Sequence, residues 1–204
     1  MPSDAKRAYL AGREMIWPVV AERYMVSLER AKEKRAAVLR PGSVTDRTGS
    51  QRRLPEVRLT HLQRLTDDTG IIQHAVYDVP NDDHGYCTDD NARALIVSVM
   101  LAEADPEHAE LAERLARRYL AFIGHAFDAT SGHFHNMMSY ERHWLDEVGS
   151  EDSNARALWA LGVVIGRSPH AGLRAAATRV FDAALPLALG LTHVRSWGYA
   201  MLGV

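Results

Sequence analysis

The stretch GYCTDDNARALIVSV, residues 85–99, is partly repeated by GSEDSNARALWALGV, residues 149–163. Both segments open on Gly, pass through acidic residues, and then read Asn-Ala-Arg-Ala-Leu into an apolar run. Thr88 and Ser150 precede the acids, and hydroxyl residues are favoured N-caps, so each segment predicts the start of a helix. The repeat therefore predicts two equivalent helices with carboxylates and an Asn-x-Arg pair at their N-terminal ends.

Two kinds of helix alternate around this repeat. Residues 89–102 are apolar nearly all round beyond Arg93, which is typical of a helix buried on all sides. Residues 107–124 carry a single apolar stripe with Glu and Arg opposite, as expected for a helix in an outer layer.

The same order then returns along the chain. The segment NARALWALGVVIG predicts a second buried helix, and residues 170–188 predict a second one-sided helix. A third buried helix is expected to begin at RSWGYAMLGV, residues 195–204. This alternation predicts an all-α fold of stacked αα-hairpins with an inner and an outer layer, and long helices without intervening strands argue against a Rossmann or TIM architecture.

The N-terminal quarter has a different organisation. Apolar side chains at three- and four-residue spacing predict helix over residues 5–36, with Pro18 in the first turn of a second helix. Two Pro and two Gly in RPGSVTDRTGSQRRLPE predict a linker. The expected domains are a helical segment over 1–37, a linker over 38–57, and an αα-hairpin domain over 58–204.

Composition narrows the classes of protein. The chain has 204 residues with 47% hydrophobic content, enough to bury a core, and it contains no apolar run of about 18 residues that predicts a membrane span. A single cysteine, Cys87, excludes an intrachain disulfide and fits a reducing compartment. No signal-peptide core is present at the N-terminus. The expected location is the cytoplasm.

Charge is unevenly distributed. Residues 1–56 carry twelve Lys/Arg against seven Asp/Glu, a net charge of +5, whereas residues 57–204 carry twelve against nineteen, a net charge of −7. The basic residues are dispersed without interleaved aromatic residues, so nucleic-acid binding is not expected. An acidic main domain with clustered aspartates suits neutral polyols, cations or sugars.

Two strand-like connections, GIIQHAVYDVP and GHFHNMMSYERHWL, precede the repeated helices, and long connections beside a rigid scaffold often carry function. His133 and His135 are expected on one strand face, but two ligands fall short of a metal site, so neither a metal nor another cofactor is predicted. No phosphate loop or GxSxG elbow appears.

In stacked hairpins, the N-termini of inner helices gather around one end of the central axis. Asp89, Asp90 and Asp152 are therefore expected to meet in one cavity as catalytic carboxylates. Glycosidic bond cleavage or transfer needs two carboxyl groups, and clustering raises the pKa of one while its neighbour stays ionised. The simpler alternative is that acids in a first helical turn only stabilise the helix dipole.

Further polar and aromatic residues are predicted to bind substrate around these acids, since amides and guanidiniums donate to hydroxyl groups and aromatic rings stack on sugars. They are Asp67, Asp68, His74, His84, Tyr86, Asn91, Arg93, Tyr140, Arg142, Glu151, Asn154 and Arg156. The alternative for the arginines is that each pairs with acids of a neighbouring helix. Trp144 is another candidate stacking residue, whereas Trp159, inside an apolar run, is expected in the core.

Two long motifs carry a family resemblance. HLQRLTDDTGIIQHAVYDVPNDDHGYCTDDNARALI and NMMSYERHWLDEVGSEDSNARALWALG resemble a bacterial module fused behind group 1 glycosyltransferases (GT-B fold, retaining), which is similar to the six-hairpin glycosidase-like superfamily. GREMIWPVVAERYMVSLERA resembles the closing C-terminal helices of such transferases. The resemblance implies an (α/α)6 toroid with a carbohydrate substrate in an acidic cavity.

The chain departs from that family in two respects. The nucleotide-sugar-binding GT-B lobes are absent, and a closed ring needs about twelve helices, of which residues 57–204 supply about five. The chain thus resembles an internal piece, with a glycosyltransferase lobe or the remainder of the toroid as an expected partner, or self-association over its apolar edge. Three functions stay open: a carbohydrate-active enzyme module, a non-catalytic carbohydrate-binding or scaffolding module, and an α-solenoid interaction domain.

Overall fold

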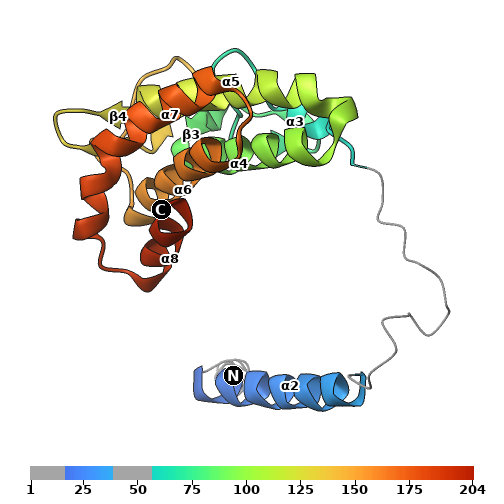
Figure 1. Cartoon of the computed structure of the whole chain (residues 1–204). Helices are drawn as coiled ribbons and strands as arrows, with labels where there is room; N and C mark the ends of the chain where they lie inside the picture. The colour runs from blue at the N-terminus through green and yellow to red at the C-terminus, as the bar shows by residue number, and fades with distance from the viewer. Residues whose placement is uncertain (1–16, 39–56) are drawn as a thin grey trace, which may run out of the picture. The chain divides into compact units, whose positions relative to one another are not determined.

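The computed structural model describes residues 17–38 and 57–204, with side chains over 17–32 and 57–204. Two compact units, Met1–Glu56 and Val57–Val204, make up the chain. In the first unit, α2 (Trp17–Val38) is one helix with Pro18 in its first turn, as predicted, and the side chains described over 17–32 are mostly exposed (Figure 1). The predicted helix before residue 17 and nearly all of the predicted linker lie outside the described residues.

The second unit is mostly helical, with three antiparallel two-stranded pairs. Its elements are α3 (Thr60–Arg64), β1 (Ala75–Val76), β2 (Val79–Pro80), η1 (Asp82–His84), β3 (Tyr86–Cys87), α4 (Thr88–Ala104), η2 (Pro106–His108), α5 (Ala109–Ala126), β4 (Phe127–Asp128), β5 (His133–Phe134), β6 (Met137–Met138), α6 (Glu151–Arg167), α7 (Ala171–Ala184), η3 (Leu185–Gly190) and α8 (Val194–Gly203). Over the described residues, no helix combines the length and apolar character needed to cross a bilayer.

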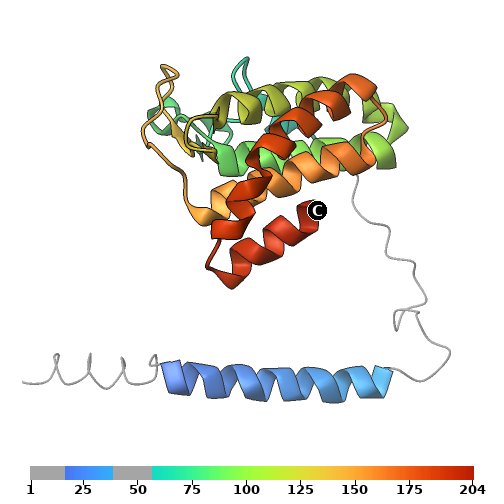
Figure 2. The same cartoon turned by 60° about the vertical axis from the view of Figure 1, so that its left-hand side comes forward.

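Five of these helices form two layers, as the alternating pattern predicts. The inner helix α6 packs against both α4 and α8, while α5 covers α4 and α7 covers α6. Figures 1 and 2 show α7 and α8 on opposite sides of α6. The hairpin layering is therefore confirmed, but the described part of the chain forms an open row and not a closed ring.

The core lies between the two layers. On α5, the spacing of Leu115, Tyr119 and Ile123 places all three on one face, and each is at most 3% exposed. Burying such side chains contributes about 1.5–3 kcal/mol each, so this stripe fixes the outer layer to the inner one. The inner helices approach closely where they carry glycine: a Cβ at Gly162 of α6 would lie 2.0 Å from the carbonyl oxygen of Gly203 in α8.

The prediction that α4 is buried on all sides is wrong. Val97 and Met100 are 50% and 44% exposed, and together with exposed Arg93 they form a stripe along one side of the helix. An inner helix is covered all round only if it has inner neighbours on both sides, and among the described helices α4 has such a neighbour only in α6. α8 likewise leaves Trp197 and Met201 exposed at the other end of the row.

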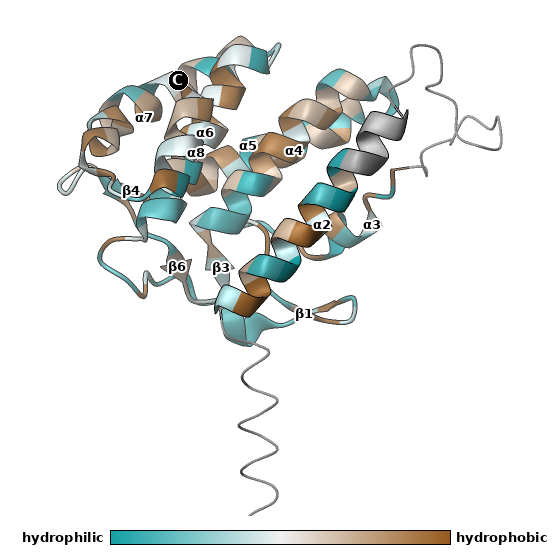
Figure 3. Cartoon of the chain, turned by 90° about the horizontal axis from the view of Figure 1, so that it is seen from below, coloured by the Kyte–Doolittle hydropathy of each residue, from teal (hydrophilic) through white to brown (hydrophobic). Residues whose placement is uncertain are grey.

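The two strand-like connections do contain strands, as predicted. β3 pairs antiparallel with β6 in the register Tyr86↔Met138 and Cys87↔Met137. Since β3 runs directly into α4, and β6 lies in the connection before α6, this pair ties both connections together at the N-terminal ends of the inner helices. Figure 3 shows hydrophilic residues at these helix ends, beside β3 and β6.

Candidate functional site

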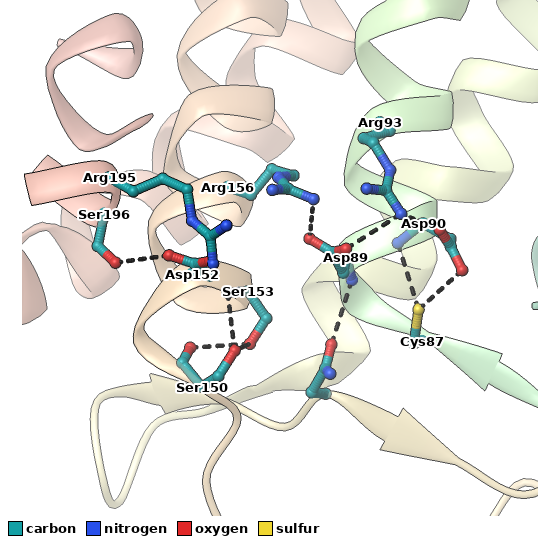
Figure 4. A network of polar contacts seen from close by, with 11 residues as sticks. Cys87, Asp89, Asp90, Arg93, Ser150, Asp152, Ser153, Arg156, Arg195 and Ser196 are labelled. Carbon is teal, nitrogen blue, oxygen red and sulfur yellow. Dashed lines mark hydrogen bonds and ion pairs between the residues drawn. The ribbon is translucent and has the colours of Figure 1, made fainter. Parts of the chain in front are cut away.

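A polar cavity of about 480 Å³ lies at the N-terminal ends of the inner helices. The three predicted catalytic carboxylates all line it, and three arginines balance their formal charge (Figure 4). The full lining is Gln73, His74, Cys87, Asp89, Asp90, Arg93, Asn136, Ser150, Asp152, Ser153, Arg156 and Arg195. The structure therefore brings residues from three helices and two connections to one hollow, which we call the Asp–Arg cavity.

The local start of α4 differs from the prediction that Thr88 is the N-cap. Thr88 is the first helical residue, and its hydroxyl donates to the carbonyl of His135 at 2.6 Å. Cys87 is the N-cap: its sulfur accepts from the backbone N–H of Asp90 at 3.4 Å and donates to the carboxylate of Asp90 at 3.0 Å. Burial raises the pKa of the Cys87 thiol, so the group stays protonated and acts as a cap.

Asp89 joins α4 to α6. Its carboxylate accepts from Arg156, which is only 8% exposed and also lies 4.5 Å over the ring of Tyr199. A second partner, Arg93, lies 3.0 Å from the same carboxylate. Burial raises the pKa of Asp89 despite these two guanidiniums, and the nearby carboxylates of Asp90 and Asp152 add to the rise.

Asp152 joins α6 to α8. It accepts from Arg195 and from the hydroxyl of Ser196 at 2.8 Å. Partial burial favours its protonated form, but the hydrogen bonds from Arg195 and Ser196 outweigh burial and hold the pKa below its ordinary value. Its helix starts as predicted, with the Ser150 hydroxyl accepting from the N–H of Ser153 at 3.2 Å. The cavity thus contains two carboxyl groups with pKa values displaced in opposite directions.

Arg195 is the principal residue that the sequence analysis missed. Counted from each N-cap, Asp89, Asp152 and Arg195 all occupy the second position of their inner helix. The inner helices are consequently linked in series, because Arg156 of α6 reaches Asp89 and Arg195 of α8 reaches Asp152. The predicted third inner helix was the available signal, since aligning its start with the other two places Arg195 at the mouth.

Asn91 and Asn154 do not line the Asp–Arg cavity. Both are buried, and each side-chain oxygen accepts from the backbone N–H twenty residues earlier, Ile71 at 3.1 Å and Phe134 at 2.8 Å. Each side-chain NH2 donates to the carbonyl four residues earlier, that of Cys87 or Ser150. The repeated asparagine therefore fastens each connection to its inner helix, which accounts for the repeat without a substrate.

Glu151 points to the segment just before α8 instead of the cavity. Its carboxylate accepts from the N–H groups of Thr192 at 2.9 Å and His193 at 3.1 Å and from the Thr192 hydroxyl at 2.7 Å. These hydrogen bonds lower the pKa of Glu151 from 4.5 to about 2, and the bond from the Thr192 N–H has the largest effect. Glu151 therefore caps the segment that leads into α8.

This depressed pKa predicts an acid-dependent stability contribution. Glu151 takes up a proton near pH 4.5 in the unfolded chain but only near pH 2 in the folded chain. Its contribution to the free energy of unfolding is therefore fully present above pH 4.5 and is lost as the pH falls toward 2. We expect Glu151→Gln to lower the melting temperature at pH 6 and to converge with the parent near pH 2. Thermal unfolding across this range tests it, with exposed Glu147→Gln as control. A deficit that persists at pH 2 would contradict the assignment.

Other predicted binding residues hold the connections together. Tyr86 is 1% exposed, its hydroxyl donates to Asp67, and its ring stacks on that of Tyr140 at 6.2 Å. Asp67 also accepts from the N–H of Thr69 at 2.7 Å. Because Tyr86 is enclosed, it cannot stack on a sugar as predicted. Neither Asp67 nor the exposed Tyr140 lines the cavity.

The remaining predicted residues separate into two places. His74 lines the Asp–Arg cavity and packs edge-to-face on His84 with 4.6 Å between ring centroids. Asp68 and Arg142 line a different cavity beside α5. The prediction that all these residues surround one site is therefore wrong for His84, Asp68 and Arg142. Each connection is long enough to contribute to two places, so that Gln73, His74 and Asn136 line the Asp–Arg cavity while Asp68 and Arg142 line the cavity beside α5.

No described cluster of His, Cys, Asp or Glu has the arrangement of a metal site. The two histidines considered as ligands are engaged with the backbone: Nδ1 of His133 lies 2.8 Å from the carbonyl of Ser131, and Nδ1 of His135 lies 2.8 Å from that of Asp146. The ring of His135 also stacks on Trp144 at 5.0 Å. These contacts give both imidazoles a structural explanation.

Comparison with protein-family models, curated proteins and solved structures found no match for this chain. The cavity itself is therefore the main indication of function. Its carboxylates, guanidiniums, hydroxyls and amides offer many hydrogen-bond acceptors and donors at nearly balanced charge.

Proposed function

We propose that the chain is a carbohydrate-active module and that the Asp–Arg cavity holds a sugar. The observation that carries this proposal is the meeting of Asp89, Asp90 and Asp152 with three arginines in one polar hollow of about 480 Å³. That volume falls within the range of small-molecule sites, which is about 300–1,000 Å³. The family resemblance of the two long motifs points to the same class of ligand.

The chemistry of the lining suits neutral polyols. A sugar hydroxyl both donates and accepts, so it is matched by a carboxylate and a guanidinium placed next to each other. Three aspartates and three arginines give a formal charge of zero, which disfavours strongly charged ligands. His74, Asn136 and Ser153 add neutral donors and acceptors around this centre.

The opposite pKa displacements suggest separate roles for two carboxyl groups. Asp89, with its raised pKa, is suited to donate a proton to a leaving-group oxygen, and Asp152, with its lowered pKa, is suited to act as base or nucleophile. Asp90 would assist by binding a hydroxyl. This assignment makes the module an enzyme of the glycosidase or glycosyltransferase type.

The inner row suggests how such a module is completed. Three inner helices, α4, α6 and α8, correspond to half of the six in an (α/α)6 toroid, and the exposed sides of α4 and α8 are where further inner helices would pack. We propose that the remainder of a toroid or a glycosyltransferase lobe meets these sides, in the cytoplasm.

One observation favours a non-catalytic scaffold as the second candidate. Every cavity aspartate already has an arginine partner, so the acids and arginines hold the inner helices in register without any ligand. In that case the cavity is an ion-pair network, and its polar groups are satisfied from within.

Sugar binding by single variants separates the candidates. We expect saturation-transfer NMR with a panel of neutral mono- and disaccharides to show binding by the parent chain, and Asp152→Asn to weaken it about tenfold through loss of one charged hydrogen bond. Asp182→Asn, at an exposed position of α7, is the matched control and is expected to bind like the parent. If Asp89→Asn loses catalytic turnover but still binds the sugar, the result supports the enzyme and not the scaffold. A parent that binds no sugar in the panel rejects the proposal and leaves the scaffold.

A further inference from the structure

A second cavity, of about 550 Å³, lies beside α5 and has a strong excess of positive charge. Four arginines and one aspartate line it, which gives a formal charge of four minus one, or +3, with its histidine neutral. The full lining is Asp68, Thr69, Arg114, Arg117, Arg118, Ala121, Phe122, His125 and Arg142. We call it the arginine cavity. Its charge distinguishes it from the balanced Asp–Arg cavity, with which it shares no lining residue.

Three of the arginines come from one rigid helix. Arg114, Arg117 and Arg118 belong to α5, whose opposite face is anchored in the core by residues such as Leu115 and Tyr119. Arg118 is further positioned by Asp68, whose carboxylate lies 3.3 Å from its guanidinium. The helix therefore presents several guanidiniums from a backbone that cannot readily move apart to relieve their repulsion.

The fourth arginine comes from a turn with an unfavourable backbone. Arg142 has φ of +67°, a conformation that residues with a Cβ rarely adopt. Hydrogen bonds between Ser139 and both Arg142 and His143, at 2.9 Å each, close the turn. Glycine or asparagine would suit this position better, so the strained turn is accounted for if the arginine side chain has a use.

Two of these guanidiniums have no partner within the described residues. The side chains of Arg114 and Arg142 make neither a hydrogen bond nor an ion pair with any residue of 17–32 or 57–204, although both line the same cavity. Arg117, by contrast, is paired with Glu113 and Arg118 with Asp68. Unpaired arginines from two separate elements at one hollow form a clamp for an anion with several oxygens.

We infer that the arginine cavity binds the phosphate or pyrophosphate group of a small molecule. Planar guanidinium forks match phosphate oxygens, and the excess positive charge, four arginines minus Asp68 and minus the Glu113 that pairs with Arg117, or +2, calls for a ligand with more than one negative charge. The volume fits a compact ligand and not an extended polymer. Phe122 and Ala121 supply a small apolar surface beside the arginines. This inference does not depend on sugar binding at the other cavity.

Calorimetry with inorganic pyrophosphate tests this inference. The full chain is titrated at fixed ionic strength, and one pyrophosphate is expected to bind per chain. Arg114→Gln and Arg142→Gln are each expected to weaken binding about tenfold, the effect of losing one charged hydrogen bond. Arg30→Gln, which removes the same charge from an exposed position of α2, is the matched control and should bind like the parent. Arg142→Gly, which accepts the positive φ, provides a folded variant that should also lose affinity.

Several outcomes would overturn the inference. Absence of measurable pyrophosphate binding by the folded parent rejects it, as does equal weakening by Arg30→Gln, which indicates only general attraction between charges. Binding to vesicles of anionic phospholipid without binding of free pyrophosphate also rejects it, because the ligand would then be a membrane surface. Asp152→Asn is expected to leave pyrophosphate affinity unchanged, so failure of sugar binding and failure of anion binding can be told apart.

Discussion

Replacement of Gly85 by alanine is expected to lower the free energy of unfolding by about 4 kcal/mol, through a backbone conformation reserved for glycine and a direct clash. Gly85 has φ of +58° and ψ of −134°. A Cβ there would lie 2.2 Å from the carbonyl oxygen of Met138 and 2.8 Å from the carbonyl carbon of Ser139. Both obstacles are backbone atoms, so no side-chain rotation relieves the overlap.

The clash also falls where it affects the candidate site. Gly85 immediately precedes β3, and β3 pairs with β6 before leading into α4. Separating β3 from β6 displaces the Cys87 cap and the Asp89 carboxylate that follows it. We therefore expect Gly85→Ala to reduce ligand binding at the Asp–Arg cavity as well as stability.

Gly132→Ala is the matched control. Gly132 also has a positive φ, +73°, but an added Cβ meets no atom within 4 Å. Only backbone strain remains, and a loss of about 1 kcal/mol is expected. Chemical denaturation of both variants measures the difference. Equal losses of unfolding free energy in the two variants would show that the close approach of the backbone at Gly85 to β6 adds nothing to the destabilisation.

The layered helical fold could be predicted because it follows from local periodicity. The one-sided stripe of α5 and the apolar runs of α4 and α6 specify which helices are outer and which are inner, and the structure confirms this. Periodicity does not specify how many neighbours an inner helix has. Val97 and Met100 are apolar, as in a covered helix, yet they are exposed because no described helix lies beyond α4.

The candidate site could be predicted in part. Two helices with similar N-terminal sequences in adjacent hairpins are expected to present those ends on one side, so the meeting of Asp89 with Asp152 follows from the repeat. The partner Arg195 does not follow from the repeat, because the third inner helix begins without the repeated motif, and only an alignment of its predicted start with the other two helices indicates it. Individual contacts such as the Cys87 cap depend on the competing bond from Thr88 to a distant carbonyl, which sequence does not reveal.

The role of the repeated asparagine could not be predicted from the sequence either. An amide beside acids at a helix mouth has the chemistry of a sugar ligand, and nothing local distinguishes that use from a structural one. The distinguishing fact is that the backbone N–H groups of Ile71 and Phe134, each twenty residues earlier, donate to the amide oxygens. The repeat is therefore a folding signal at Asn91 and Asn154, whatever the aspartates bind.

Substitution of Asn154 by alanine is accordingly expected to lower the free energy of unfolding by about 3 kcal/mol. The amide is 2% exposed, and its loss leaves the N–H of Phe134 and the carbonyls of Gly149 and Ser150 without this partner. Water cannot readily replace it, because Phe134 is itself 0% exposed. The connection between β5 and α6 is then no longer fixed to the inner row.

The destabilisation caused by each Asn→Ala variant should increase with the number of hydrogen bonds that the variant loses. Asn91→Ala removes bonds to one N–H and one carbonyl and is expected to cost about 2 kcal/mol, and Asn81→Ala, which removes a single bond to Asp83 near the surface, about 0.5 kcal/mol. Urea unfolding of the three variants at one pH gives the order directly. If Asn154→Ala proves no more destabilising than Asn81→Ala, the asparagine does not fasten the connection, and a ligand-binding use for the repeat becomes the better explanation.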